Sequence, residues 1–466
     1  MTGSGRATRF TASATGRGPA LGTLDEFWEW WSALPREEVF DVTPVPFEEM
    51  RGWGFDSRGN LVHDSGRFFS VEGLRITEGD GTLHTQPIIN QPEVGILGIL
   101  VKEFDGVLHC LMQAKFEPGN VNVRQLSPTV QATRSNYVRV HNGRPTPYVE
   151  YFRSAPRDRI LVDVLQSEQG AWFWRKRNRN MVVEVEEDVP EREGFRWLTL
   201  EQVNRLLSSD NVVNMDARTV LACMPLLPDP EPAAGEPDDA FVRALRRSYH
   251  VTGHDTAAVN TLGHVISWFT DAKLRCDWER SLIPLDEVEG WSRDENEIVD
   301  DARRAFRVMA VRVRAEGREV GQWTQPLLAP HGRQTATFLT QEIGGVLHVL
   351  VAARAEPGLM DTLEIAPTVH LRTPEQDLGL AEPFAEAVMS EDPDRVRHDV
   401  VLSEEGGRFR DAQTRYRIVD GGGRLPTEAP EGHCWVTVGQ LTELVRHCGY
   451  LNIEARTLLA CLHSLW

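Results

Sequence analysis

The sequence predicts a mixed α/β (α+β) fold built as two tandem duplicated domains, and three observations support this prediction. The strings TQPII, GVLHCLMQAKFEPG and LSPTV, beginning at Thr85, return as TQPLL, GVLHVLVAARAEPG and IAPTV, beginning at Thr324. The spacing is constant, since Glu117 and Glu356 are 239 residues apart, as are Thr85 and Thr324. In each copy, apolar segments with strand character lie between helical segments. A long block repeated at one offset indicates duplication of a whole domain.

The repeat extends beyond this block and sets the expected domain boundaries. NMDART at 214–219 returns as NIEART at 452–457. Between the copies lies LPDPEPAAGEPDD, whose four Pro, five acidic residues and lack of aromatic residues predict an extended, solvated linker at 227–240. We therefore expect a first domain at 21–226 and a second at 241–466.

We expect residues 1–20 to form a disordered N-terminal tail. They are mostly Gly, Ser, Thr, Ala and Arg, and they lack the apolar stretch of a signal peptide.

Within each copy, the element order is helix, strands, then helices. The segment LDEFWEWWSAL at 24–34 carries apolar residues at helical spacing. Asp-Gly at 105–106 separates two apolar runs and predicts a hairpin, because both residues tolerate the positive φ of a type I′ turn; Gly-Gly at 344–345 stands at the same place. We expect Thr199 and Thr437 to cap the helices that close each copy.

Composition excludes several classes of protein. A chain of 466 residues with 41% hydrophobic and 26% charged residues is typical of a soluble protein with more than one domain. The net charge of −19 argues against a nucleic-acid partner. No apolar run is long enough to span a membrane, so we expect no membrane attachment and a cytoplasmic location. The six cysteines show neither CxxC nor a Cys/His metal spacing.

Glu117 is the clearest candidate for chemistry in the repeated block. It follows a predicted strand and precedes Pro118-Gly119, a position suited to a general base in a cleft. The alternative is that Glu117 and its counterpart Glu356 only accept backbone N–H bonds from the turn. His109 and His348 also match each other, and we expect them to be half-buried structural histidines.

A second candidate is the stretch QATRSNYVRVHNGRPTPYVEYF at 131–152, which is rich in polar and aromatic residues. The second copy has HLRTPEQDLGLAEPFAEAV instead. At an offset of 239, Arg134 corresponds to Thr373 and Tyr137 to Gln376. A site in the first copy explains this contrast, with loop drift as the alternative. We therefore expect the first domain to be catalytic and the second to hold a vestigial ligand site.

The strings QPEVGILGILVKEFDGVLH, LMQAKFEPGNVN, LSPTVQATRSNY and VNMDARTVL strongly resemble the NDP-hexose 2,3-dehydratases of deoxysugar biosynthesis. The resemblance implies two Nudix-hydrolase-like domains, a homodimer and no metal or organic cofactor. It implies a dTDP-linked 4-keto-6-deoxyglucose as the substrate, which loses its C3 proton and C2 hydroxyl to give a 3,4-diketo-2,6-dideoxy sugar. A partner 3-ketoreductase would then reduce the unstable product.

This reaction needs a base at C3, donors to the C4 enolate and an acid for the leaving hydroxide. Glu117 or Glu150 could be the base, and Tyr137 or Tyr151 could be a donor. Arg124, Arg134 and Arg139 could pair with the diphosphate. The full set of expected substrate-binding residues is Trp53, Gln86, Gln113, Lys115, Arg124, Gln131, Arg134, Asn136 and Arg139.

Two other functions are compatible with parts of the sequence. One is a non-catalytic nucleotide-sugar binding protein. The other is a Nudix-type diphosphate hydrolase, but the helices at 199–207 and 214–223 lack the acidic cluster that such an enzyme uses to hold Mg²⁺. Glu201 and Asp216 stand alone there, so the sequence disfavours hydrolysis.

Overall fold

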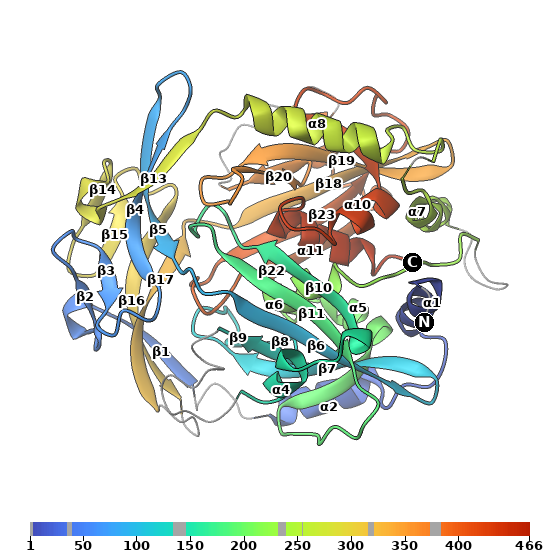
Figure 1. The fold of residues 1–466 in the computed structure, drawn as a ribbon, viewed down its shortest axis with the longest axis horizontal. Helices are drawn as coiled ribbons and strands as arrows, with labels where there is room; N and C mark the ends of the chain where they lie inside the picture. Colours follow the sequence, from blue (N-terminus) through green and yellow to red (C-terminus); the bar gives the residue numbers. More distant parts are fainter. Residues whose placement is uncertain are drawn as a thin grey trace.

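Each copy contributes one seven-stranded mixed sheet, and the two sheets share one topology (Figure 1). The computed structural model describes residues 3–34, 40–133, 146–231, 239–253, 255–315, 321–372 and 384–466. In copy one, the sheet has the order β10-β11-β6-β7-β12, with β8 on β7 and β9 on β6. These strands are β6 (Gly95–Phe104), β7 (Val107–Phe116), β8 (Arg124–Ser127), β9 (Val130–Ala132), β10 (Ile160–Ser167), β11 (Arg177–Glu184) and β12 (Phe195–Thr199).

Copy two repeats this arrangement with β22-β23-β18-β19-β20, β21 on β18 and β24 on β19. In both sheets one pair is parallel, β11 with β6 and β23 with β18. The strands are β18 (Gln334–Ile343), β19 (Val346–Ala355), β20 (Leu363–Ala366), β21 (Val369–Leu371), β22 (Val396–Ser403), β23 (Gln413–Asp420) and β24 (His433–Thr437). The predicted hairpin turns are confirmed, because Asp105, Gly106, Gly344 and Gly345 all have positive φ.

Helices cover both sheets, and the closing helices join the two copies. Thr199 and Thr437 cap α5 and α10 through complete capping boxes, as predicted. The central helices α6 and α11 pack together, and Arg218 Nε donates to Thr457 Oγ1 at 3.3 Å while Arg456 Nε donates to Thr219 Oγ1 at 2.8 Å. The helices are α2 (Leu24–Ala33), α4 (Val149–Arg153), α5 (Leu200–Leu207), α6 (Met215–Leu221), α8 (Leu262–Arg275), α9 (Phe384–Val388), α10 (Val438–Leu444) and α11 (Ile453–Leu462), with short 3₁₀ turns at Phe47–Glu49, Arg157–Arg159 and Leu285–Glu287.

The two copies exchange their first strands. Strand β1 (Phe40–Val45) of copy one pairs with β16 (Phe306–Ala315) of copy two, and β13 (Glu279–Ile283) of copy two pairs with β4 (Ser70–Thr77) of copy one. The resulting pair of five-stranded sheets lies to one side of the molecule, on the left in Figure 1. Their other strands are β2 (Trp53–Phe55), β3 (Leu61–His63), β5 (Leu83–Asn90), β14 (Trp291–Arg293), β15 (Glu297–Asp300) and β17 (Gln322–Pro330).

Residues 3–14 form helix α1 (Gly3–Ala14), so the expectation of a disordered tail is wrong for this segment. Phe10 is completely buried, and Ala7 and Ala14 lie beside it at helical spacing. Ser13 Oγ donates to the carbonyl of Leu108 at 2.6 Å, which ties α1 to β7. The helical periodicity was weak in the sequence because the packing face of α1 consists of one large apolar residue and two alanines.

Helix α7 (Ala240–His250) takes the place of α1 in copy two, where Ser248 Oγ donates to the carbonyl of Leu347 at 2.6 Å. Asp239, at the end of the expected linker, caps α7. Residues 232–238 of that linker lie outside the described residues.

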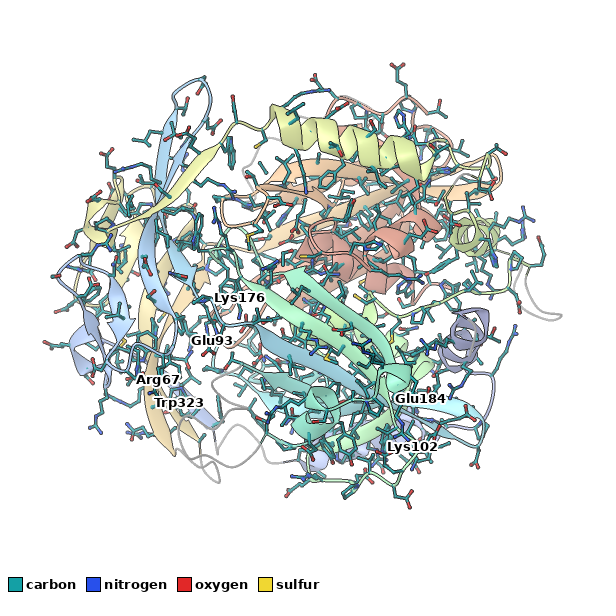
Figure 2. The ribbon with its side chains drawn as sticks, viewed as in Figure 1. Arg67, Glu93, Lys102, Lys176, Glu184 and Trp323 are labelled. Carbon is teal, nitrogen blue, oxygen red and sulfur yellow. The ribbon has the colours of Figure 1, made fainter. Side chains whose placement is uncertain are left out.

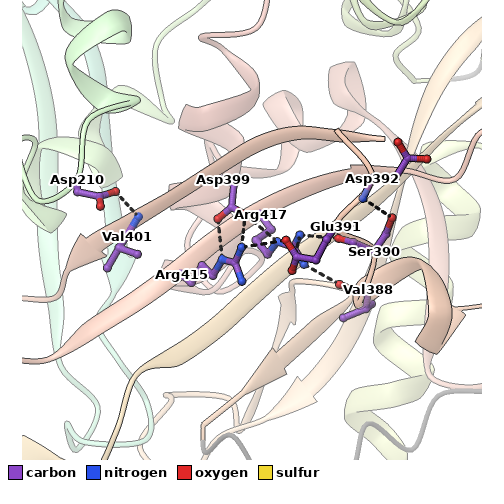
Figure 3. A network of polar contacts seen from close by, with 9 residues as sticks. All are labelled: Asp210, Val388, Ser390, Glu391, Asp392, Asp399, Val401, Arg415 and Arg417. Carbon is purple, nitrogen blue, oxygen red and sulfur yellow. Dashed lines mark hydrogen bonds and ion pairs between the residues drawn. The ribbon is translucent and has the colours of Figure 1, made fainter. Parts of the chain in front are cut away.

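The outer edge of the copy-two sheet carries a network of ion pairs (Figure 3). Arg415 forms a two-point contact with Asp399, at 2.8 and 2.6 Å, and Arg417 Nη1 donates to the carbonyl of Val388 in α9 at 2.9 Å. Asp210 of copy one accepts from the backbone N–H of Val401 at 2.9 Å. The network therefore anchors α9 and adds one more contact between the copies.

None of the helices in the described residues is both long and apolar enough to cross a membrane.

The exchanged strands predict that the halves stay together without a covalent link. A protease site inserted within residues 232–238 and then cleaved should leave both fragments eluting at the size of the uncut protein in size-exclusion chromatography. The physical reason is that β1 and β13 each complete a sheet in the other copy, and α6 packs on α11. Fragments that separate without denaturant would contradict this arrangement.

Candidate active site

The EPG turn of each copy receives a loop from the other copy. The N–H of Gly119 donates to the carbonyl of Gly406 at 2.7 Å, and the N–H of Gly358 donates to the carbonyl of Gly170 at 2.6 Å. A Cβ at Gly119 would lie 1.7 Å from the carbonyl oxygen of Phe409, so only glycine permits this approach. The repeated EPG string therefore builds the junction between the copies.

The glutamine of each TQP string positions the loop that its own copy inserts. Gln86 Nε2 donates to the carbonyl of Ala171 at 2.8 Å, and Gln325 Nε2 donates to the carbonyl of Gly407 at 2.9 Å. Gln86 was expected to bind substrate, and the structure places its amide on this backbone instead.

Glu117 lies at the end of β7 with its carboxylate buried beside polar side chains. Its Oε1 accepts a hydrogen bond from Gln131 Nε2 at 2.7 Å and lies 3.5 Å from Lys115 Nζ. Gln131 Oε1 in turn accepts from Asn214 Nδ2 at 3.2 Å, and Asn214 also caps α6. This chain of contacts fixes the carboxylate beside the Lys115 ammonium.

The loop inserted from copy two forms the other side of this cluster. A Cβ at Gly407 would lie 3.6 Å from Glu117 Oε1, and one at Gly406 would lie 2.9 Å from Glu117 Cβ. Arg408 follows directly. Its Nε donates to Gln91 Oε1 at 3.0 Å, and its guanidinium lies 4.4 Å from the ring centroid of Phe69.

The cluster holds more carboxyl groups than can ionise together. Burial, then the negative charges of Glu405, Glu168 and Glu117, raises the pKa of Asp216 well above its usual range. Burial likewise raises the pKa of Glu405, with Glu117 adding to the shift. Asp216 is 2% exposed and its Oδ2 has no hydrogen-bond partner in the described residues. The raised pKa therefore favours the neutral form of Asp216, which interacts electrostatically with Glu117 in the same cluster.

Further buried polar groups extend the cluster toward the exchanged sheets. Asn178 Nδ2 donates to Glu168 Oε1 at 2.6 Å, and burial together with the charge of Glu405 raises the pKa of Glu168 to about 8. Lys176 Nζ donates to the carbonyl of Glu93, and burial lowers its pKa. Figure 2 shows Lys176 and Glu93 between the large sheets and the exchanged sheets.

Asn120, in the turn after Glu117, is 5% exposed, and neither its Oδ1 nor its Nδ2 has a partner among the described residues. Asn120 and Asp216 therefore present buried polar atoms without partners, and a polar ligand could form hydrogen bonds with them.

In the matching site of copy two, two arginines lie beside the equivalent glutamate, Glu356. Arg372 Nη2 lies 2.9 Å from Glu356 Oε1, and Arg354 Nη1 donates to the carbonyl of His370 at 2.8 Å. Oxygen and nitrogen atoms of Glu356, His370 and Glu454 lie within 4.8 Å of one another, close enough for one metal ion. Two guanidinium groups at this position oppose a divalent cation, so the residues present do not favour a metal site.

The remaining expected site residues lie in three places. Trp53 packs against Phe69, with ring centroids 4.8 Å apart, in the core of the exchanged sheets. Arg124 lies 4.7 Å from the ring centroid of Trp31 in α2 and donates to the carbonyl of Leu34 at 3.4 Å. Gln113 is half-buried on β7, two residues before Lys115.

Glu150 and Tyr151 lie on α4, with Glu150 exposed and Tyr151 half-buried. Burial and the charges of Glu187 and Glu150 raise the pKa of Tyr151. Glu187 accepts from Lys102 Nζ at 2.9 Å through its carbonyl, and Lys102 is at the opposite side of the sheet from Lys176 in Figure 2. The structure does not bring Glu150 and Tyr151 to Glu117. Arg134, Asn136, Tyr137 and Arg139 lie outside the described residues.

The two histidines are structural, as expected, but both are completely buried rather than half-buried. His109 Nδ1 bonds to the carbonyl of Val107 at 3.0 Å, and its Nε2 accepts from the N–H of Leu21 at 3.2 Å. His348 repeats this with Val346 and Val259, both at 3.0 Å. Burial lowers the pKa of both rings.

Sequence reasoning missed Asn214, Asp216, Glu405 and Arg408. The signal for the first two was present, because NMDART and NIEART keep an Asn and an acidic residue in both copies. No signal could join Glu405 and Arg408 to Glu117, because they belong to the other copy.

Comparisons with known proteins agree with this architecture. A family model described as NDP-hexose 2,3-dehydratase matches residues 24–224 and again residues 262–462. The chain belongs to the NDP-hexose 2,3-dehydratase family, a family of lyases, as its sequence motifs predicted.

Three relatives cover most of the chain, and each is named a dTDP-4-dehydro-6-deoxy-alpha-D-glucopyranose 2,3-dehydratase. The protein from Saccharopolyspora spinosa is 49% identical over 100% of this chain and 96% of its own length. Those from Streptomyces violaceoruber and Amycolatopsis orientalis are 46% and 45% identical, over 94% and 93% of this chain and 97% and 89% of their own lengths.

One buried carboxyl makes the stability of the fold depend on pH. Glu364 Oε2 accepts from Ser167 Oγ at 2.6 Å, and burial raises its pKa to about 7 from 4.5. The equivalent residue in copy one is Gln125, whose Nε2 donates to Ser403 Oγ at 2.9 Å. The native state keeps a proton on Glu364 that the unfolded chain releases near its ordinary pKa, so its contribution is fully present below pH 4.5 and is lost as pH rises through 7.

Glu364→Gln should therefore remove part of the loss of stability at alkaline pH. Since one pKa unit corresponds to about 1.4 kcal/mol, the variant should gain on the order of 3 kcal/mol over the wild type near pH 9. Denaturant unfolding at pH 5 to 9 measures this. Glu428→Gln, at an exposed turn residue, is the control. An identical pH dependence in the wild type and Glu364→Gln would contradict the assignment.

Proposed function

We propose that the protein is a 2,3-dehydratase acting on dTDP-4-keto-6-deoxyglucose, with its active site at Glu117 in copy one. The names of the three relatives support the substrate. The observation that carries the location is the pairing of a buried, lysine-neighboured carboxylate with a neutral carboxyl, Asp216.

The first step is removal of the C3 proton. The C4 ketone acidifies this proton, so the reaction requires no cofactor as an electron sink. Glu117 takes the proton as general base, and the negative charge moves to the C4 oxygen as an enolate. Lys115, 3.5 Å from Glu117, places a positive charge beside the base and near the enolate that forms.

The second step breaks the bond between C2 and its oxygen. The electron pair of the enolate returns to form the C2=C3 double bond, and hydroxide leaves only if it receives a proton. Asp216 is suited to supply that proton because its raised pKa keeps it neutral. The product is an enol at C3, which becomes the 3,4-diketo-2,6-dideoxy sugar when a proton moves to C2.

Copy two is proposed to hold a vestigial site. Arg372 pairs with Glu356 at the position where copy one has Thr133, so a guanidinium occupies the space beside the equivalent carboxylate. The inserted loops support the same view. The loop beside Glu356 has Trp172 at the position where the loop beside Glu117 has Arg408.

Several further expectations remain proposals. Each copy would be a Nudix-like domain, a proposal supported by the mixed sheet with helices on both faces. The protein would work as a cytoplasmic homodimer alongside a 3-ketoreductase. Arg134 and Arg139 would pair with the diphosphate, and Tyr137 or Tyr151 would donate to the enolate or to the leaving oxygen.

Incubation with dTDP-4-keto-6-deoxyglucose tests the proposed activity. The expected product, trapped by a ketoreductase and NADPH, has lost the C2 oxygen while its diphosphate is intact. Mass spectrometry and NMR measure both. Recovery of unchanged substrate, or cleavage of the diphosphate, would contradict the proposal.

Glu117→Gln should lower kcat by about 10²–10⁴-fold, because an amide cannot accept the C3 proton. Glu356→Gln, the same substitution at the equivalent position of copy two, is the matched control and should retain activity close to the wild type. Equal losses in both variants would indicate a structural role for the repeated glutamate. Tyr137→Phe and Tyr151→Phe are measured in the same assay. Wild-type kcat in either variant would contradict a catalytic role for that tyrosine.

A further inference from the structure

The loop that copy two inserts beside Glu117 differs from its counterpart in charge. This inserted loop consists of Glu405, Gly406, Gly407 and Arg408. The equivalent loop of copy one, placed beside Glu356, consists of Gln169, Gly170, Ala171 and Trp172. The backbone contacts of the two loops are the same, so the difference in side chains serves a need that only one of the two sites has.

Arg408 is held rigidly by residues of copy one and by its own loop. Its Nε donates to Gln91 Oε1 at 3.0 Å, its Nη1 donates to the carbonyl of Gly407 at 2.7 Å, and its guanidinium stacks 4.4 Å from the ring centroid of Phe69. Two of its three guanidinium nitrogens therefore donate hydrogen bonds that fix the orientation of the side chain.

The third nitrogen, Nη2, has no hydrogen-bond partner in the described part of the chain. Burial lowers the pKa of Arg408, and the charges of Glu405, Glu117 and Asp216 oppose that shift. The neighbouring Gly407 would put a Cβ 3.6 Å from Glu117 Oε1. Nη2 is thus the one guanidinium nitrogen of Arg408 without a partner among the described residues, and it belongs to the loop whose Gly407 faces Glu117 Oε1.

An enolate needs such a donor close to the base, because the oxygen that gains charge is on the carbon next to the one that loses the proton. Lys115 is already engaged, since it donates to the carbonyl of Gln131 at 3.4 Å and lies beside Glu117. A fixed donor in a water-poor site also stabilises developing charge without reorganising. Asn120, with both polar atoms unpaired nearby, is consistent with room for a bound sugar.

We propose that Arg408 of copy two is a catalytic residue of the copy-one active site, whose Nη2 donates to the C4 oxygen of the sugar as it becomes the enolate. This inference rests on the proposed function. It makes the duplication a requirement for catalysis, because the copy-one active site needs residues from both copies. It also gives the charged loop of copy two a role in copy one, while Arg372 pairs with Glu356 in copy two's own site.

The test separates proton removal from the loss of hydroxide. Exchange of the C3 proton for deuterium in D₂O, followed by NMR, reports enolate formation, and product formation gives kcat and KM. Arg408→Gln should lower the rate of C3 exchange and kcat together by about 10²–10³-fold, with KM changed only a few-fold. Arg408→Lys should recover part of the lost exchange rate and kcat, because lysine restores the positive charge but not the paired N–H donors of the guanidinium.

Arg410→Gln is the matched control. Arg410 is two residues along the same segment, and its side chain pairs with Asp411 at 3.4 Å. Its kinetics should match those of the wild type. Thermal unfolding of all variants monitors folding, and if Arg408→Gln fails to fold, Arg408→Ala supplemented with guanidinium ions replaces it, with restored C3 exchange as the expected result.

Wild-type C3 exchange in Arg408→Gln would overturn the inference. A large rise in KM with unchanged kcat would also overturn it, because that pattern indicates binding of the diphosphate rather than the enolate. If the wild type itself neither exchanges C3 nor eliminates hydroxide from the dTDP sugar, the proposed function fails instead, so the two failures are distinct.

Discussion

The close approach of two glycine-containing backbones is the constraint on which the rest of this structure depends. Gly119 and Gly406, and again Gly358 and Gly170, meet through N–H to carbonyl bonds of 2.7 and 2.6 Å. Any side chain at Gly119 would collide with the facing carbonyl. These contacts place the loop of one copy directly against the strand-end glutamate of the other, so neither copy can form its polar site alone.

The buried carboxyl groups at this junction determine what it can do chemically. Removing several like charges from water is unfavourable, and the pKa values of Asp216 and Glu405 rise as a result. The Lys115 ammonium lies 3.5 Å from the Glu117 carboxylate. The same physical situation arises in copy two, but there Arg354 and Arg372 supply internal counter-charges. Burial raises the pKa of Glu454 to about 8 there, so the two sites share a buried acid and differ in the cations that surround their glutamates.

Much of the fold could be predicted because its signals are local. The Asp-Gly and Gly-Gly turns, the caps at Thr199 and Thr437 and the constant repeat offset each depend on neighbouring residues or on direct comparison of the copies. Helix α1 was missed because only Phe10 and two alanines form its packing face. Glu117, Lys115 and Gln131 were predicted as site residues from the sequence, and they lie together at the ends of β7 and β9. Trp53, Gln86 and Arg124 were expected to bind substrate, but their contacts hold the framework together.

The sequence by itself determined the duplication, the mixed α/β class and the membership of the NDP-hexose 2,3-dehydratase family. Only the tertiary structure decided that the copies exchange strands and loops, and that Glu405 and Arg408 lie beside Glu117. The physical reason is that such contacts join residues of different copies, where no periodicity or spacing along the chain relates them. The sequence of a repeated motif is the same whether the motif packs on its own copy or on the other copy. Only the packing of the folded chain distinguishes the two arrangements.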